Sequence, residues 1–556
     1  MAEEPVGSEK TKPALSLFGN HEKLLGGGGP LRCQDAENNS SGSERGKEDG
    51  GGDVDVETGR TTQLERGMTS RHLQFIAVGG TIGTGLFLGI GGALSTAGPV
   101  SLLIAFAFMG TVVYSVMASL GEMASFMPVA GSFTVYASRL VDPTLGFSMG
   151  WIYWFSWSIT FALELTASGL IIQYWARHLS IAIWIAVFWA VFTAVNCLPV
   201  RWFGEIEMWF SSIKVVTIVG FILFAICVNA GVGDEGYIGF RYWRDPGPFA
   251  EYMVHGDTAK FVGFWAVLVT AAFTYQGTEL VGVGAGETKN PEKSIPSAIR
   301  WTFWGILILF LATVFFVGIN LPYDLEALKD SGSTTNASAS PLVLIAFRAG
   351  VPVLPDIINA VLLTAVLSAA NSNVYSSSRI LVALADEGLA PAWTKRTNRW
   401  GTPYVAVCLC SLLGLLAFLN LSDSGSLVFT WLLNISSTSA LITWALINLT
   451  HMRFLRILRV QGVDRARLPY RAPWQPYLSW YGLFFNSLIV LTSGFTVFIS
   501  WSTSGFFSCY VSLMLWVALY VGHKIVCRTK IVPLAEANLN IGREDMAVHE
   551  VREASD

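Results

Sequence analysis

Long apolar stretches, separated by short polar segments, make up the chain from about residue 74 onward. A bilayer core of about 30 Å needs roughly 20 apolar residues per helix. Twelve stretches approach or exceed that length, at residues 74–96, 99–125, 146–175, 180–198, 205–229, 261–284, 301–321, 354–384, 403–420, 427–450, 480–500 and 505–526. The alternating pattern of a membrane barrel is absent. The sequence therefore predicts an all-α membrane protein with twelve transmembrane helices.

The composition agrees with a membrane protein and excludes several other classes. Of the 556 residues, 52% are hydrophobic and 14% are charged, with 54 Gly and 20 Trp. Soluble domains carry about 25% charged residues, so a soluble enzyme is disfavoured. The net charge of −4 offers no basic surface for a nucleic acid. No metalloprotease, esterase or nucleotide-binding motif is present, and we expect no enzyme activity, metal or cofactor.

The two ends of the chain differ from its apolar body. Residues 1–70 contain 13 acidic and 8 basic residues and little apolar sequence, which predicts a disordered acidic tail. Residues 71–526 form the predicted transmembrane domain, and residues 527–556 form a second tail. Lys and Arg concentrate in the loops on one side, so the positive-inside rule places both tails in the cytoplasm.

The first apolar stretch contains four glycines within residues 79–85. Each glycine weakens a helix by roughly 1 kcal/mol relative to Ala, which favours local unwinding. Unwound backbone at membrane depth is tolerated where it lines a cavity. Its free N–H groups suit a carboxylate and its carbonyls suit an ammonium group, whereas helix–helix contact through small residues is the alternative. The candidate ligand residues are Thr81, Ile82, Gly83, Thr84 and Gly85.

The sixth stretch has a second interruption, rich in glycine between residues 277 and 286. Glycine-broken helices at the first position of two five-helix blocks indicate an inverted-repeat transporter with its site at the membrane midplane. The repeats would cover about 74–229 and 261–450, and residues 480–526 would form two extra helices. The candidate site residues in the second interruption are Phe273, Thr274, Tyr275, Gly277 and Glu279.

Motifs in four helices, read in order, give the chain a family resemblance. The motifs are residues 80–87 (GTIGTGLF), 119–123 (SLGEM), 276–282 (QGTELVG) and 368–373 (SAANSN). They resemble those of fungal amino acid permeases of the amino acid–polyamine–organocation superfamily. This resemblance implies the leucine-transporter fold and proton-coupled uptake across the plasma membrane. It also implies that the tail lysines Lys10, Lys12 and Lys23 are candidates for a ubiquitin ligase.

Three further stretches are similar to those of the permeases for arginine and lysine. They are residues 153–165, 239–244 and 271–276. The tenth helix departs from this subgroup, because Thr430 precedes Trp431 where an acidic residue is expected. A permease for neutral amino acids, or for a broad range of them, therefore remains the alternative.

Ionisable groups inside predicted helices are functional candidates by default. We expect Glu164 to meet the distal cation of arginine or lysine, or else to make an interhelical hydrogen bond. We expect Glu279 to bind the coupling proton or a substrate cation, or else to cap the half-helix that follows it. The family implies that Lys214 replaces the cation of sodium-coupled relatives, by cycling a proton or by holding the first helix. A salt bridge from Lys214 to Glu205 or Glu207 is its less favoured alternative.

Five further side chains complete the predicted site. Phe273 is expected to form a lid over the bound amino acid, and core packing is the alternative. Asn371 in the eighth helix, and Trp431 and Ser436 in the tenth, are expected to line the site or to pack between helices. Glu122, near the inner end of the second helix, is expected to fix a cytoplasmic gate.

These observations lead to one preferred function and two alternatives. The preferred function is proton-coupled uptake of arginine and lysine across the plasma membrane by alternating access. A neutral or broad-range permease is the first alternative. An amino acid receptor that does not transport is the second, and the short tails disfavour it.

Overall fold

The computed structural model describes residues 79–129, 131–176, 178–283, 291–329, 340–421 and 425–540. The side chains of residues 200–206 and 425–426 lie outside this description. The chain divides into two units, Met1–Glu48 and Asp49–Asp556, and every described residue belongs to the second. The predicted acidic tail and its lysines therefore lie outside the described residues.

The described part of the chain is helical throughout and contains no β-strand. Its elements, including short π-helical and 3₁₀ segments labelled η, are η1 (Gly85–Gly89), α2 (Ile90–Ala97), α3 (Pro99–Phe126), α4 (Phe133–Tyr136), η2 (Ala137–Val141), α5 (Pro143–Ile172), α6 (Ile181–Val195), α7 (Val200–Asn229), α8 (Arg241–Arg244), α9 (Asp257–Ala266), α10 (Leu268–Tyr275), α11 (Leu280–Val283), α12 (Pro291–Asn320), α13 (Glu326–Lys329), α14 (Pro341–Arg348), α15 (Leu354–Asp386), η6 (Ala392–Lys395), α16 (Tyr404–Gly414), η7 (Leu415–Leu421), α17 (Gly425–Val460), η8 (Arg465–Arg467), α18 (Tyr477–Thr492), α19 (Phe495–Ile499) and α20 (Thr503–Cys527).

Ten helical segments among the described residues are long and apolar enough to cross a membrane. Two shorter apolar helical stretches, Gly85–Ala97 and Ile181–Val195, fall where the first and fourth spans were predicted. A multi-pass helical membrane protein is therefore confirmed. The short first stretch has a physical reason, since its preceding turns contain the glycine-rich break.

Several helices extend beyond their predicted apolar stretches. Helix α12 begins ten residues before the predicted start, with Pro291 at its first position, and α17 continues to Val460. Their terminal turns carry charged residues such as Glu292 and Arg459, which lower the local hydropathy without ending the helix. Hydropathy therefore located the apolar part of each of these helices. It did not locate their ends, because the helical backbone continues through turns that carry charged residues.

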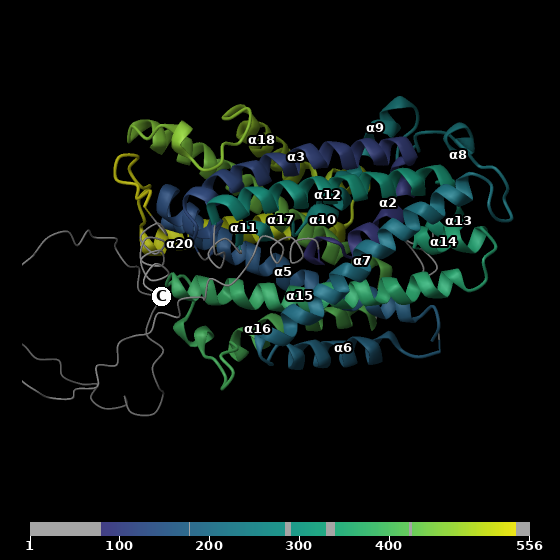
Figure 1. Ribbon diagram of the computed structural model, residues 1–556, viewed down its shortest axis with the longest axis horizontal. Helices are drawn as coiled ribbons and strands as arrows, with labels where there is room; N and C mark the ends of the chain where they lie inside the picture. The colour runs from purple at the N-terminus through teal and green to yellow at the C-terminus, as the bar shows by residue number, and fades with distance from the viewer. Residues whose placement is uncertain are drawn as a thin grey trace, which may run out of the picture. The chain divides into compact units, whose positions relative to one another are not determined.

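The long helices run in similar directions, and the short helices α8, α9, α13 and α14 gather at one end of them (Figure 1). Helix α5 packs against both α15 and α17, and α3 packs against α12. Almost all of α5 is buried, including the polar Ser156, Thr160 and Glu164. This central helix carries polar side chains into the interior, where a site can form.

The segment after α20 is tied to the helical body. Val532 N donates to Val141 O at 3.0 Å, and Thr529 donates to Asp142 at 2.7 Å. Lys524 forms an ion pair with the same Asp142 carboxylate. The described part of the predicted C-terminal tail therefore contacts the turn that precedes α5.

Candidate binding site

The first predicted break is present in the structure. Residues 79–81 form a helical turn, Ile82 and Gly83 leave the helix, and η1 begins at Gly85. Backbone groups at these two residues are therefore released from the regular helical pattern. The glycine-rich sequence correctly predicted this interruption.

The second break lies between α10 and α11. Helix α10 ends at Tyr275, Gln276 is extended, and Gly277 has φ of +104°, a conformation that other residues rarely adopt. A Cβ added at Gly277 would lie 3.0 Å from the backbone carbonyl of Gly80. The two breaks therefore meet backbone to backbone, and glycine is needed at the point of contact.

A small buried cavity lies beside this contact. It is lined by residues of both breaks and of helices α5, α10 and α15, namely Gly80, Thr81, Gly83, Thr84, Gly85, Trp157, Thr160, Glu164, Phe273, Gln276 and Asn373. The cavity brings together six of the residues predicted from sequence, which are Thr81, Gly83, Thr84, Gly85, Glu164 and Phe273.

Glu164 supplies the carboxylate of the cavity. Its Oε1 accepts a hydrogen bond of 3.0 Å from the Thr84 hydroxyl, which joins α5 to the first break. Its buried Oε2 has no hydrogen-bond partner among the described residues. Glu164 therefore makes the interhelical hydrogen bond that was one of the two expectations for it. Its second oxygen remains a free acceptor among the described residues.

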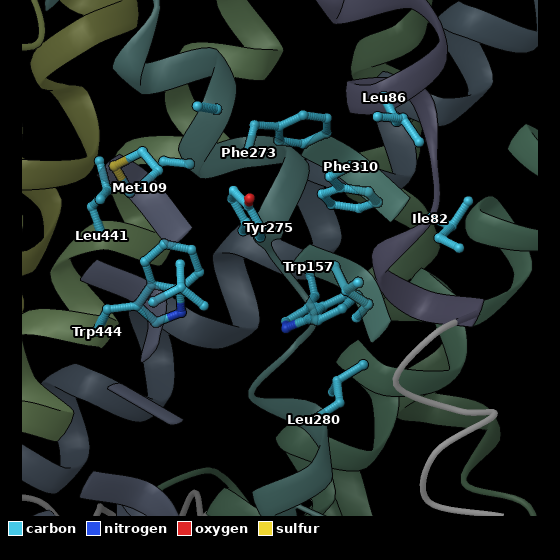
Figure 2. Close-up of a cluster of buried hydrophobic side chains, with 14 of the residues drawn as sticks. Ile82, Leu86, Met109, Trp157, Phe273, Tyr275, Leu280, Phe310, Leu441 and Trp444 are labelled. Atoms are coloured by element: carbon cyan, nitrogen blue, oxygen red, sulfur yellow. The ribbon is translucent and has the colours of Figure 1, made fainter. Parts of the chain in front are cut away.

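Phe273 lies at the edge of the first break. A Cβ added at Gly85 would meet the Phe273 ring at 2.9 Å, so the ring covers this glycine. Figure 2 shows Phe273 and Trp157 among buried side chains that include Ile82 and Leu86. Phe273 therefore borders the cavity and the apolar core at once, which fits both the lid and the packing interpretation.

Glu279 lies outside the cavity lining, in a different environment. Its carboxylate accepts hydrogen bonds from Tyr153 at 3.2 Å, from Gly277 N at 3.2 Å and from Trp444 at 3.3 Å. All these partners hold the second break and its neighbours α5 and α17 together. These contacts hold the break in place, but the backbone donor among them, Gly277 N, precedes the half-helix α11 that Glu279 was expected to cap.

Seven further predicted residues also fall outside the cavity lining, and most have structural contacts. Asn371 accepts a hydrogen bond from Asn196 at 2.8 Å, and Tyr275 donates to the Phe106 carbonyl at 3.1 Å. The Thr274 hydroxyl donates to a backbone carbonyl of its own helix.

Ser436 donates a hydrogen bond of 3.0 Å to Gln276, which lines the cavity, so Ser436 lies directly behind the lining. The remaining three are Ile82, which is buried in the core, Trp431, which packs against the core, and Gly277, which forms the contact between the breaks.

Lys214 connects three parts of the structure. Its ammonium donates to the Gly79 carbonyl at 2.6 Å and lies 3.9 Å from Glu207 Oε1. Glu207 in turn accepts a hydrogen bond of 3.0 Å from Ser368 of α15. Lys214 therefore makes the less favoured ion pair with Glu207 and also holds the first segment through the Gly79 carbonyl. The Glu205 side chain lies outside the described residues.

Glu122, which was expected to fix a cytoplasmic gate, contacts the segment between α17 and α18. Its carboxylate pairs with the Arg465 guanidinium, with one contact of 2.8 Å, and accepts from Ala472 N at 3.0 Å. His451 Nε2 lies 3.3 Å from the same carboxylate. The hydrogen bond to Glu122 raises the pKa of Arg465 further, so this guanidinium stays charged.

Sequence reasoning missed five lining residues, namely Gly80, Trp157, Thr160, Gln276 and Asn373. Gln276 and Asn373 carried a usable signal, because each is an amide within an apolar helix and within a family motif. Gly80 belongs to the glycine-rich break and Trp157 to the stretch 153–165, but neither residue type by itself distinguishes a lining position, since small and aromatic residues are common throughout this chain.

Ten apolar spans, two broken helices and a buried polar cavity between them define the class of multi-pass membrane transporters. The comparison with known sequences is more specific. The chain belongs to the amino acid permease family, whose profile matches residues 72–535.

Curated relatives of this family differ in the substrates that their names state. The chain is 44% identical over 467 residues to the basic amino-acid permease of Saccharomyces cerevisiae, covering 83% of this chain and 81% of that protein. It is 44% identical over 471 residues to the lysine-specific permease of the same yeast, covering 84% and 77%. It is 41% identical over 491 residues to the yeast dicarboxylic amino acid permease, covering 87% and 81%. Overall identity therefore leaves the substrate to be argued from the site.

Proposed function

We propose that the protein is a plasma-membrane permease that takes up arginine and lysine together with a proton by alternating access. In this proposal the two broken helices begin two inverted five-helix repeats, and α18 with α19 and α20 form the extra pair of spans. Both termini then face the cytoplasm. The named relatives for basic amino acids at 44% identity support this substrate class.

One observation carries the substrate class, namely the free Oε2 of Glu164 in the cavity. An unpaired carboxylate oxygen buried away from water is costly unless a cation or another donor meets it. An ammonium or guanidinium group supplies such a donor and also balances the charge. A substrate with a neutral side chain would offer this Glu164 oxygen only its α-ammonium group as a cationic donor.

The coupling role is assigned to Lys214. Its ammonium holds the Gly79 carbonyl while Glu207 ties it to α15 through Ser368. Loss of the proton would weaken these contacts and release the first segment, whereas protonation would restore them. Glu279 is the less suitable coupling group, because its carboxylate is already held by three donors.

Two further residues are proposed to act as gates. Phe273 would move away from Gly85 to admit an amino acid, because the cavity in this structure is small. Glu122 would hold the loop that contains Arg465 against α3 on the cytoplasmic side. Both contacts are of the kind that changes when helices shift relative to one another.

The test is uptake of labelled arginine at pH 5 and pH 7.5 in cells that lack their own amino acid permeases. We expect faster uptake at pH 5, and inhibition by excess unlabelled lysine but not by leucine or proline. Equal inhibition by leucine would establish the broad-range alternative. Absence of arginine uptake from protein that reaches the plasma membrane would refute the proposed substrate.

A further inference from the structure

The polar side chains that line the cavity are almost all engaged by protein partners. The Gln276 amide donates to Ser156 at 3.1 Å and accepts from Ser436 at 3.0 Å. The Thr84 hydroxyl donates to Glu164 at 3.0 Å. These groups already have well-formed hydrogen bonds, so a ligand would gain little from them without breaking existing contacts.

Three lining atoms differ from the rest, because each is buried without a hydrogen-bond partner among the described residues. They are the acceptor Oε2 of Glu164 and two donors, Nε1 of Trp157 and Nδ2 of Asn373, and the side chains of Glu164 and Asn373 are each 2% exposed. Buried polar groups in native proteins are nearly always paired. A free acceptor beside free donors in the same cavity is therefore best explained by a ligand that carries both a donor and an acceptor.

Asn373 also has a suitable position. It is the cavity-lining residue of α15, one helical turn after Ala369. A Cβ added at Gly83 would lie 3.5 Å from the Ala369 side chain. Helix α15 therefore packs against the first break at this level.

The chemistry of basic amino acids identifies the group that Asn373 would meet. A guanidinium and an ammonium are donors without an acceptor, so the α-carboxylate is the acceptor of arginine or lysine. We propose that Asn373 Nδ2 donates a hydrogen bond to the substrate's α-carboxylate, while Glu164 accepts from a cationic group of the same substrate. This inference rests on the proposed function and adds a residue that orients the substrate.

The test compares arginine with argininamide, in which a neutral amide replaces the carboxylate. Binding of each ligand to the purified full-length protein is measured by isothermal titration calorimetry for the native sequence and for Asn373→Asp. The new carboxylate repels arginine but accepts from the argininamide N–H₂ group. We expect the ratio of arginine to argininamide affinity to fall at least about tenfold, the size of one charge-assisted hydrogen bond.

Asn359→Asp is the matched control. Asn359 lies on the same helix and is fully buried, with no hydrogen-bond partner in the part of the chain that the structure describes, but it does not line the cavity. We expect this variant to leave the affinity ratio unchanged. Asn373→Leu, which is similar in size and uncharged, should weaken arginine binding more than argininamide binding, because the lost hydrogen bond is charge-assisted for a carboxylate but not for an amide carbonyl. This variant serves where the Asp variant does not fold.

The possible outcomes separate the two proposals. An unchanged ratio in the folded Asn373 variants, or an equal loss of both ligands, would overturn the role of Asn373. Failure of the native protein to bind arginine would instead overturn the proposed substrate class.

Discussion

Two carboxylates are buried beside the broken helices, and their surroundings differ. Glu279 accepts three hydrogen bonds and lies outside the cavity lining. Glu164 lines the cavity and uses one oxygen for Thr84, while the other has no partner among the described residues. Burial and residue type alone therefore do not identify a binding residue; the number of unused hydrogen-bonding positions does.

The comparison assigns each carboxylate a different measurable role. Glu279 should matter mainly for the folded state, because removing it leaves several buried donors unpaired. Glu164 should matter mainly for transport, because its unused oxygen accepts no hydrogen bond from the described residues and is left for a ligand. The predictions below follow from this difference, in order of decreasing effect.

The largest effect is expected for Glu164→Gln. The amide keeps the size of the side chain but cannot balance a substrate cation, so arginine and lysine uptake should fall roughly 100-fold or more. Initial uptake rates, corrected for protein at the cell surface, provide the measurement. Glu326→Gln changes an exposed glutamate of α13 in the same way and should leave uptake unaltered. Normal arginine uptake by Glu164→Gln would contradict the role of this carboxylate.

Lys214→Met should remove the acceleration of uptake at pH 5 relative to pH 7.5. The apolar side chain fills similar space but carries no proton and cannot hold the Gly79 carbonyl. Exchange of labelled for unlabelled arginine in reconstituted vesicles should be retained to a greater degree than net uptake. A preserved pH response would show that another group carries the proton.

Glu279→Ala should lower stability rather than select against a substrate. The Tyr153 hydroxyl, the Trp444 indole and the Gly277 amide would lose their acceptor, at a cost of about 1–3 kcal/mol for each group. A lower melting temperature of the purified protein would be the direct readout. Arginine uptake by this variant should still be inhibited by lysine and not by leucine. Inhibition by leucine would instead place Glu279 in the substrate site.

The smallest effect is expected for Gly277→Ala, at about 1–3 kcal/mol of strain. The positive φ and the 3.0 Å approach to Gly80 leave no room for a methyl group. Gly220→Ala on α7 is the control, since nothing lies within 4 Å of its added Cβ. Equal melting temperatures for the two variants would show that the breaks can separate without cost.

Sequence patterns determined the membrane class, the positions of the spans and the two breaks. They could do so because apolar length and glycine spacing are local properties of the chain. The family motifs likewise lie within single helices, and the comparison with known proteins confirmed the family.

Only the tertiary structure decided which polar residues share the cavity. Asn371 and Asn373 stand two positions apart in one apolar helix, yet the first bonds Asn196 and the second faces the cavity. Glu164 and Glu279 were both candidates in the sequence, and their separate roles depend on partners 80 and 165 residues away in the chain. Such partners are set by the packing of distant helices, because a side chain's free hydrogen-bonding positions depend on neighbours that no local pattern records.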